Sequence, residues 1–445
     1  MIFEKYLNKL SGTKRKVVTN VFWALLGKIV TLLSTLIVSV LVARYLGPEQ
    51  FGVMNYVVSV VSLFSIFATF GMSDIVVREL SKNNLSKDEI LGTAFILRIV
   101  LSSLTITSVA IYAILFENSG GLSTMMIIYS IFMLFACFDV IRSYFISIIQ
   151  NKRVVISEIS RSLLGALIKI LLVVFNAPLV YFIAALAFDF LLLSMGYLAN
   201  YQKIDTCKNW KYNAKFSVFL LKNSFPLLIA GAATTIYQRI DQVMISRMID
   251  NASVGYFSTA LSFVGVLVFI PMIMIQTVSP ILVDYKKNNP QKYDIESQRM
   301  MNIIVWTTIS VCIVLSILSY PIIYFTYGVK YLPAVPVMRI LVFKAVGLAL
   351  TMTGGQLIII ENIHKFAFVR NILACIVCVI SNYLLIPHWG IIGCAWATII
   401  TALFSGGLGN LLIPPYYHIL KKQFYCICFG WKDFIKIKTI IRSKI

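Results

Sequence analysis

Residues 44–52 read RYLGPEQFG and separate two long apolar runs, 17–43 and 53–72. A weaker copy, RMIDNASVG at 247–255, again separates two apolar runs. In both copies an Arg is followed eight residues later by a Gly, and the copies start 203 residues apart. A second pair, IIQN at 148–151 and IIEN at 359–362, is offset by 211 residues. Two nearly equal offsets predict that the chain is one half written twice.

The composition indicates a chain that uses lipid as its solvent. Hydrophobic residues make up 59% of the 445 residues and charged residues 13%, more apolar surface than a soluble core can bury. A membrane-spanning helix takes about 20 apolar residues, so the runs supply about a dozen spans. They are longer than barrel strands and lack a two-residue alternation. We therefore predict an all-α integral membrane protein.

The apolar runs form two sets of six, with the longest polar stretch between spans, 201–222, separating them. We expect an N-terminal six-helix lobe at 1–206, a C-terminal six-helix lobe at 207–415 and a basic cytoplasmic tail at 416–445. The tail is also aromatic, and we expect it to lie on the anionic inner leaflet. The expected spans are 17–43, 53–72, 91–116, 124–149, 157–176, 178–200, 222–246, 254–276, 300–326, 335–360, 367–386 and 389–413.

The net charge of +21 predicts an orientation rather than a nucleic-acid partner. Of the 39 Lys and Arg residues, 29 precede the first span or follow an even-numbered one. The loops on the opposite side hold only Arg44, Arg247 and Lys330. This asymmetry predicts that both termini are cytoplasmic. Because the basic residues form separate short clusters rather than one basic face, nucleic-acid binding is not expected.

Cysteine and histidine usage gives no indication of a metal or a disulfide. The pair Cys375 and Cys378 lies inside an apolar run with no second pair, which favours plain helix packing. The three histidines, His364, His388 and His418, are scattered, so no zinc site is expected. We predict no cofactor beyond a possible coupling proton or sodium ion.

Seven basic residues that the loop clusters do not include lie inside the apolar runs, together with three acids. A charge near the bilayer centre costs about 2.5–3.5 kcal/mol on insertion scales, so such groups should face a protein interior or a watery cavity. Even complete pairing would leave four cations without an acid. A cavity with surplus positive charge suits phosphates or pyrophosphates and disfavours cationic drugs. The predicted substrate-binding cations are Lys28, Arg98, Arg142, Lys169, Arg239, Arg339 and Lys344, and the three acids are Asp139, Asp189 and Asp241.

For some of these charged residues the sequence also allows roles other than substrate binding. Arg98 and Arg142 are near span ends and could snorkel to the inner surface. Asp139 and Arg142 are three residues apart, a spacing that suits an intrahelical ion pair. Arg239 and Asp241 point to different sides of one helix, so each should find a partner on another helix. Asp189 and Asp241 are candidates for carrying a coupling proton or cation.

Two stretches of this sequence resemble the signatures of a known family. RYLGPEQFG at 44–52 and NYLLIPHWGIIGCAWAT at 382–398 look like motifs of the polysaccharide-biosynthesis flippases, which transport lipid-linked oligosaccharides in O-antigen and capsule pathways. These belong to the multidrug/oligosaccharidyl-lipid/polysaccharide exporter superfamily. The resemblance covers about residues 10–415 in span count, repeat and loop pattern. Neither motif specifies a substrate or picks out the intramembrane cations.

The resemblance implies a MATE-like fold, with two six-helix repeats around a central cavity that opens alternately to each side. The cargo would be an undecaprenyl-pyrophosphate-linked oligosaccharide, turned from the inner to the outer leaflet of the bacterial cytoplasmic membrane. The other partners implied are membrane lipid, a polymerase and other proteins of envelope-glycan assembly. The protein would act as a monomer and would carry no catalytic residue.

Three rivals stay open. A multidrug antiporter of the same superfamily would be expected to place acids in its cavity. A lipid II flippase usually has two further spans. A membrane polymerase, ligase or glycosyltransferase needs a sizeable outer loop with carboxylates, whereas the acids of the outer loops here are Glu49, Glu117 and Asp250.

Overall fold

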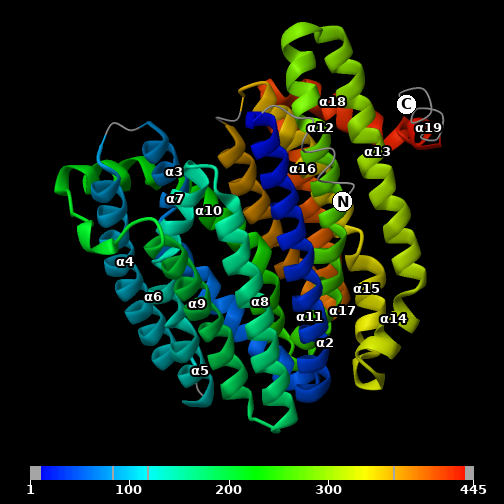
Figure 1. Cartoon of the computed structure of the whole chain (residues 1–445). Coiled ribbons are helices and arrows are strands. Elements are labelled where there is room, and N and C mark those ends of the chain that lie inside the picture. Colours follow the sequence, from blue (N-terminus) through cyan, green and yellow to red (C-terminus); the bar gives the residue numbers. More distant parts are fainter. Residues whose placement is uncertain (1–11, 83–84, 118–119, 364–365, 436–445) are drawn as a thin grey trace, which may run out of the picture. The chain divides into compact units, whose positions relative to one another are not determined.

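The computed structural model describes residues 12–82, 85–117, 120–363 and 366–435 (Figure 1). Within these ranges the regular structure is entirely helical, without strands, so the predicted fold class is confirmed. The first eleven and last ten residues, including the basic side chains of those ends, lie outside the described residues, as does His364.

The chain divides by packing into two compact units. Unit 1 comprises Met1–Leu46 and Val57–Ala232, and unit 2 comprises Gly47–Tyr56 and Ala233–Ile445. The division at 206/207 between two sequence repeats stays a prediction, because units defined by packing are not repeats. Helices α2 (Gly12–Thr69) and α10 (Ala214–Met248) contribute to both units. Unit 1 otherwise contains α3 (Met72–Lys82), α4 (Lys87–Phe116), α5 (Gly120–Ser130), α6 (Phe132–Ala136), α7 (Asp139–Ser147), α8 (Asn151–Val174), α9 (Leu179–Gln202) and η1 (Cys207–Asn209).

Unit 2 continues from α10 to the end of the described chain. Its remaining elements are α11 (Asn251–Leu267), α12 (Phe269–Asn288), α13 (Pro290–Ile317), α14 (Ser319–Thr326), η2 (Val329–Tyr331), α15 (Ala334–Leu341), α16 (Lys344–Ile360), α17 (Ala367–Gly406), η4 (Leu408–Leu412), η5 (Pro414–Tyr416), α18 (Tyr417–Phe429) and α19 (Trp431–Ile435).

Nine helical stretches of the described chain are long and apolar enough to cross a membrane. Two of them, in α2 and α17, each contain two spans, because Gly47 and Gly390 leave the helical conformation inside them. Helix α8 adds a further helix of 24 residues that carries five charged side chains. All twelve expected spans therefore have a helical counterpart, and the chain is a multi-pass membrane protein.

The stretch at 44–52 forms a turn between two helical segments. Gly47 has φ 74° and ψ 172°, a conformation that a residue with a Cβ rarely adopts. Pro48 follows it and starts the next segment, where its missing N–H costs no helical hydrogen bond. The second copy turns differently, since the Asp250 carboxylate accepts a 2.7 Å hydrogen bond from the Ser253 amide and caps α11.

The two copies of this motif lie against each other within unit 2. A Cβ on Gly52 would meet the backbone carbonyl of Asn251, and a Cβ on Gly255 would meet the carbonyl of Pro48. The Arg247 guanidinium lies 5.6 Å from the centre of the Tyr56 ring. The glycine that ends each copy is therefore required by close backbone approach.

Two predicted spans are interrupted at matching places. Span 124–149 breaks before Asp139, where α7 begins, and span 335–360 breaks before Lys344, where α16 begins. Both breaks are closed by hydrogen bonds that span three residues instead of four. The two charged residues are 205 positions apart, close to the offsets of the repeated motifs. No Gly or Pro marks either break, so sequence patterns did not reveal them.

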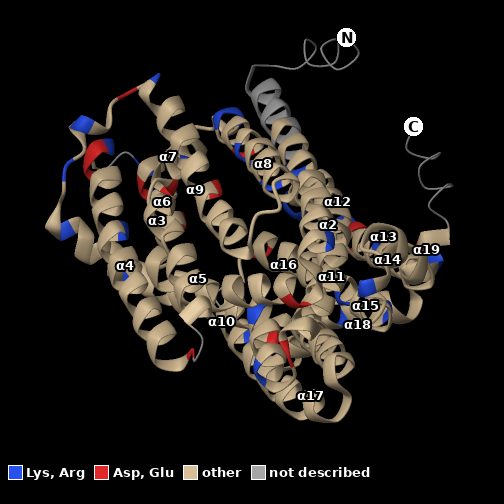
Figure 2. Ribbon diagram, turned by 90° about the horizontal axis from the view of Figure 1, so that it is seen from below, with Lys and Arg blue, Asp and Glu red and all other residues tan. Residues whose placement is uncertain are grey.

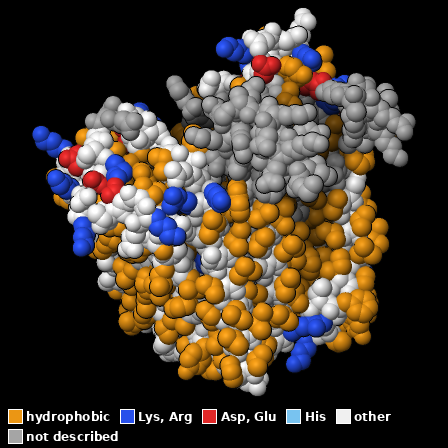
Figure 3. Space-filling view, viewed as in Figure 1, with side chains coloured by type: hydrophobic (Ala, Val, Ile, Leu, Met, Phe, Trp, Pro, Cys, Tyr) orange, Lys and Arg blue, Asp and Glu red, His pale blue; other side chains and the backbone are white. Residues whose placement is uncertain are grey.

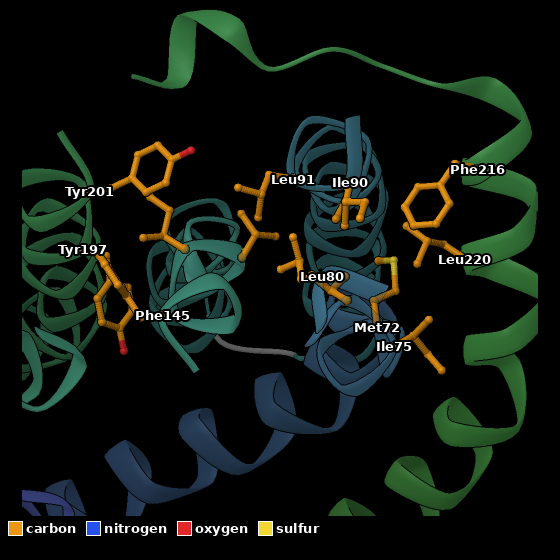
Figure 4. Close-up of a cluster of buried hydrophobic side chains, with 14 of the residues drawn as sticks. Met72, Ile75, Leu80, Ile90, Leu91, Phe145, Tyr197, Tyr201, Phe216 and Leu220 are labelled. Carbon is orange, nitrogen blue, oxygen red and sulfur yellow. The ribbon is translucent and has the colours of Figure 1, made fainter. Parts of the chain in front are cut away.

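Unit 1 has a buried core where α3, α4, α7, α9 and α10 converge (Figure 4). Met72 and Ile75 of α3 face Phe216 and Leu220 of α10, and Phe145 of α7 packs beside Tyr197. Charged side chains gather over the end of α3 and α4 next to this core, whereas the visible sides of these helices are mostly hydrophobic (Figure 3). The core therefore lies near the charged ends of these helices. Burial of its side chains there removes apolar surface from water.

The segment after Pro415 is part of unit 2. Tyr416, Ile419 and Cys426 are fully buried in a core that α13 and α16 share. The Trp306 indole donates a 2.9 Å hydrogen bond to the Cys426 carbonyl. The Gln423 amide donates to the Gly406 carbonyl at 2.5 Å. Residues 417–435 thus pack as helices on unit 2, and the cytoplasmic placement of the basic tail at 416–445 stays a prediction.

Candidate functional site

Charged side chains interrupt the membrane helices at few positions (Figure 2). Those of unit 1 are largely paired with acids. The Arg98 side chain of α4, 2% exposed as a residue, donates from Nη2 to the Ser73 hydroxyl at 2.8 Å. Its Nη1 lies 3.6 Å from the Asp139 carboxylate, while its Nε is buried without a partner. Arg98 therefore has both an acid and a hydroxyl partner inside unit 1.

A pocket of about 230 Å³ surrounds this pair. Its lining combines Arg98 and Asp139 with hydroxyl groups of Ser65, Thr69 and Ser194 and with apolar side chains. Ligand pockets for drug-sized molecules usually measure about 300–1,000 Å³, so this one fits water or a small polar group and not an oligosaccharide. Because a water takes up about 30 Å³ of liquid, the pocket has room for several.

The ion pairs differ from the one that the spacing of Asp139 and Arg142 predicts. Asp139 forms its ion pair with Arg98, and the Arg142 Nε lies 3.6 Å from a Glu158 oxygen on α8. The predicted intrahelical ion pair between Asp139 and Arg142 is therefore wrong. The two side chains are still close enough for an electrostatic attraction. The physical reason is burial: Arg98 is almost inaccessible and needs an acid more than the half-exposed Arg142 does.

Lys169 and Lys28 complete the predicted cations of unit 1. Lys169 of α8 forms an ion pair with Asp189 of α9, and both side chains are largely buried. One oxygen of Asp189 is buried without a hydrogen bond. Lys28 is exposed on α2 and has no hydrogen bond or ion pair with any residue that the structure describes. The role of all three in binding or coupling stays a prediction.

Asp241 is the most deeply buried acid of unit 2. Its residue is 1% exposed on α10. Its carboxylate accepts hydrogen bonds from the Asn382 amide at 2.7 Å, the Thr398 hydroxyl at 3.0 Å and the Cys378 thiol at 3.5 Å. All three donors belong to α17, which confirms that Asp241 finds its partners on another helix. The Asn382 carbonyl oxygen is buried without a partner.

The predicted cations of unit 2 have no comparable partners. Lys344 is 7% exposed and its charge acts on Cys378 and Cys394, which also neighbour Asp241. The Arg339 Nε donates to the Ser319 hydroxyl at 3.1 Å. Among the described residues, Arg239, Arg339 and Lys344 have no acid within 4 Å. Unit 2 therefore carries uncompensated positive charge in its membrane helices.

Sequence reasoning missed several polar residues of unit 2. Arg370 was not among the predicted intramembrane cations, although it lies in the expected span 367–386; it is 6% exposed with Nε and Nη1 unpartnered. Asn382 and Thr398 were noticed only as parts of a family motif. Polar side chains inside an apolar run are the signal that could have linked them to Asp241.

No group of three or more His, Cys, Asp and Glu residues that could hold a metal occurs in the described ranges. The oxygens of Asp241, Asn382 and Thr398 are still the type of donor that hard cations such as sodium prefer. A cation bound here would take the place of the Asn382 amide as the partner of the Asp241 carboxylate. The donor set therefore fits the predicted coupling ion.

Comparisons with known proteins agree on one group. A family model described as polysaccharide biosynthesis protein matches residues 17–286. The chain is 21% identical over 424 residues to the capsular polysaccharide biosynthesis protein CapF of Staphylococcus aureus, which covers 92% of this chain and 100% of CapF.

Solved structures with the same fold include two kinds of transporter. The lipid II flippase MurJ in an inward closed conformation has a TM-score of 0.70 and 16% identity, covering 93% of this chain and 92% of that one. An inward-facing multidrug resistance MATE family transporter of the MOP superfamily has a TM-score of 0.67 and 15% identity, covering 88% and 96%. At these identities the similarity shows the fold, and the predicted MATE-like architecture is confirmed.

Proposed function

The chain belongs to the polysaccharide biosynthesis protein family, and on this basis we propose that it is a flippase for lipid-linked oligosaccharides. The cargo is an undecaprenyl-pyrophosphate-linked repeat unit, which moves from the inner to the outer leaflet of the bacterial cytoplasmic membrane by alternating access. Both termini are cytoplasmic. The polymerase and the other envelope-glycan assembly proteins act on the cargo afterwards.

The observation that carries this proposal is the excess of intramembrane cations over acids. Among the described residues, Lys28, Arg239, Arg339 and Lys344 have no acid within 4 Å. An uncompensated cation in a membrane helix is costly unless an anion or water meets it. A pyrophosphate supplies that anion, and guanidinium and ammonium groups bind phosphate oxygens through charge-assisted hydrogen bonds.

The transport step requires no covalent chemistry. Sugars and charged phosphates cross hydrocarbon slowly because their desolvation is not compensated there. Polar and cationic side chains along the path replace part of the hydration shell, while the lipid tail stays in the bilayer. The protein is therefore a transporter and not an enzyme.

Coupling to an ion gradient is proposed at Asp241. Its carboxylate is buried and has no cation within 4 Å among the residues that the structure describes. A proton or a sodium ion would neutralise this charge, and the neighbouring oxygens of Asn382 and Thr398 are suited to bind sodium. Asp189 is the weaker candidate because Lys169 already pairs with it.

Deletion of the gene with complementation tests the proposal. The expected result is accumulation of lipid-linked repeat units on the inner leaflet and loss of surface polysaccharide, both reversed by the intact gene. Normal surface glycan with lost drug efflux would identify a multidrug exporter instead. Accumulation of lipid II alone would identify a peptidoglycan-precursor flippase.

A further inference from the structure

Arg370 is a buried cation for which the described chain supplies no counterion. It occupies the first turn of α17, is 6% exposed, and its Nε and Nη1 have no hydrogen-bond partner. Of the eighteen acids in the sequence, Glu4 alone lies outside the described residues, and no other acid forms an ion pair with Arg370. A buried charge without an anion is strongly unfavourable, so this guanidinium is built to receive one.

The groups around Arg370 add hydrogen-bond donors. Tyr237 of α10 and Tyr416 of η5 lie near the guanidinium, and the Tyr416 hydroxyl already donates a 3.0 Å hydrogen bond to the Ile363 carbonyl. The Ser405 hydroxyl is buried and lies close enough to the Tyr237 side chain to form a hydrogen bond with it. A Cβ on Gly409 would lie 3.2 Å from the Arg370 Cγ, so the backbone of η4 closes tightly over the side chain. Packing therefore holds the Arg370 side chain in place, with two unpartnered N–H groups and neighbouring hydroxyls available to an oxyanion.

The position of the site indicates where the anion comes from. Arg370 lies where α17 begins, and η4 follows where the same helix ends at Gly406. Helix ends of membrane spans lie at the depth of lipid headgroups. Leu408, Leu411 and Leu412 of η4 are exposed by 58–62%, and Phe366 before α17 is also exposed. An apolar surface beside an unpartnered guanidinium matches a ligand with acyl chains and a phosphate.

We propose that Arg370 binds the phosphate of a membrane phospholipid, whose acyl chains lie along the exposed leucines of η4. The Ser405 hydroxyl and the Tyr237 phenol complete the phosphate site. This lipid is a resident component of unit 2 and is distinct from the transported cargo. The assignment does not depend on the flippase proposal, because lipid binding is measured without transport.

Native mass spectrometry of the purified full chain in detergent tests the assignment. Phosphatidic acid and diacylglycerol with the same acyl chains differ only in the phosphate. We expect the intact protein to bind one phosphatidic acid tightly and to show no matching binding of diacylglycerol. R370Q should bind phosphatidic acid about tenfold or more weakly, since hydrogen bonds to a charged group are lost.

R299Q is the matched control, because Arg299 of α13 already forms a 3.0 Å ion pair with Glu296 and is partly exposed. It should bind phosphatidic acid like the intact protein, and R370K should retain part of the affinity. Equal binding by R370Q and the intact protein overturns the proposal. Displacement of the lipid by millimolar inorganic phosphate or pyrophosphate would overturn the lipid as the ligand.

Thermal unfolding of the intact protein keeps the test decisive if R370Q does not fold. Phosphatidic acid should raise the unfolding temperature, whereas diacylglycerol and inorganic phosphate should leave it unchanged. Equal stabilisation by diacylglycerol would show that the phosphate is not recognised and would overturn the proposal.

Discussion

The two units differ in how far the charges inside their membrane helices are paired. In unit 1, Arg98, Arg142 and Lys169 each lie beside an acid, at Asp139, Glu158 and Asp189 respectively, whereas Lys28 is exposed and has no acid among the described residues. In unit 2 the described cations of the spans have no acid within 4 Å, and these are Arg239, Arg339, Lys344 and Arg370. Paired charges hold helices together, whereas unpaired cations are available to an anionic ligand.

Matching positions of the two units show the same contrast. Helices α7 and α16 both begin at a break inside a predicted span, and the first residue is Asp139 in one and Lys344 in the other. Asp139 compensates a buried arginine, while Lys344 is a cation close to the residues around Asp241. Matching positions thus hold a paired acid in unit 1 and a cation without a described acid within 4 Å in unit 2.

The largest expected effect on stability tests the pairing in unit 1. D139N leaves the buried Arg98 without its acid, and we expect a loss of about 2–3 kcal/mol in the free energy of unfolding, below the value for a fully buried pair because Asp139 is partly exposed. Denaturant unfolding of the purified protein measures it. The double variant R98M/D139N should recover most of the loss. A stability unchanged by D139N would remove the contrast between the units.

The next prediction tests the surplus cations. R239A and K28A should each lower export about tenfold or more, because a charge-assisted contact with phosphate is lost, and membrane abundance should not change. Cell-surface glycan and lipid-linked intermediates provide the readout. K436A, outside the described residues, should export normally. If R239A and K28A both export normally, these positions do not bind cargo.

A smaller effect is expected from D241N, which removes the charge of Asp241 and keeps the shape of the side chain. D241N should make export independent of the coupling ion while cargo binding persists. Transport in proteoliposomes with and without sodium, at several pH values, separates the two ions. Ion dependence that persists in D241N would assign coupling to another residue, with Asp189 the next to test by D189N.

The smallest test concerns the last helices of unit 2. Burial, with the Asp433 charge as a lesser contribution, raises the pKa of the Cys426 thiol to about 12, whereas Cys428 is exposed. A thiol reacts as its thiolate, so maleimide at pH 8 should label Cys428 and leave Cys426 unmodified. Mass spectrometry of the labelled peptides measures this. Equal labelling would mean that α18 does not pack on unit 2.

Local sequence features predicted most of the helical framework. Apolar runs identified the spans, because crossing a bilayer requires about 20 apolar residues whatever the neighbours are. RYLGPEQFG identified the turn at Gly47, since a Gly-Pro pair constrains its own backbone. The motif at 382–398 likewise contains the turn at Gly390. Each of these features depends on residues that are close in the sequence.

The partner of each charge was decided by tertiary structure alone. Arg98 pairs with Asp139 across 41 residues, and Asp241 bonds to Asn382 across 141. Arg370 lies near the start of an expected span, and only the packing of α17 and η4 shows that it is buried. Composition determined that this chain is embedded in lipid and has more basic than acidic residues there, because each side chain has its own free energy of transfer from water to lipid. Which bases stay unpaired depends on the contacts between distant helices, and only the folded chain contains that information.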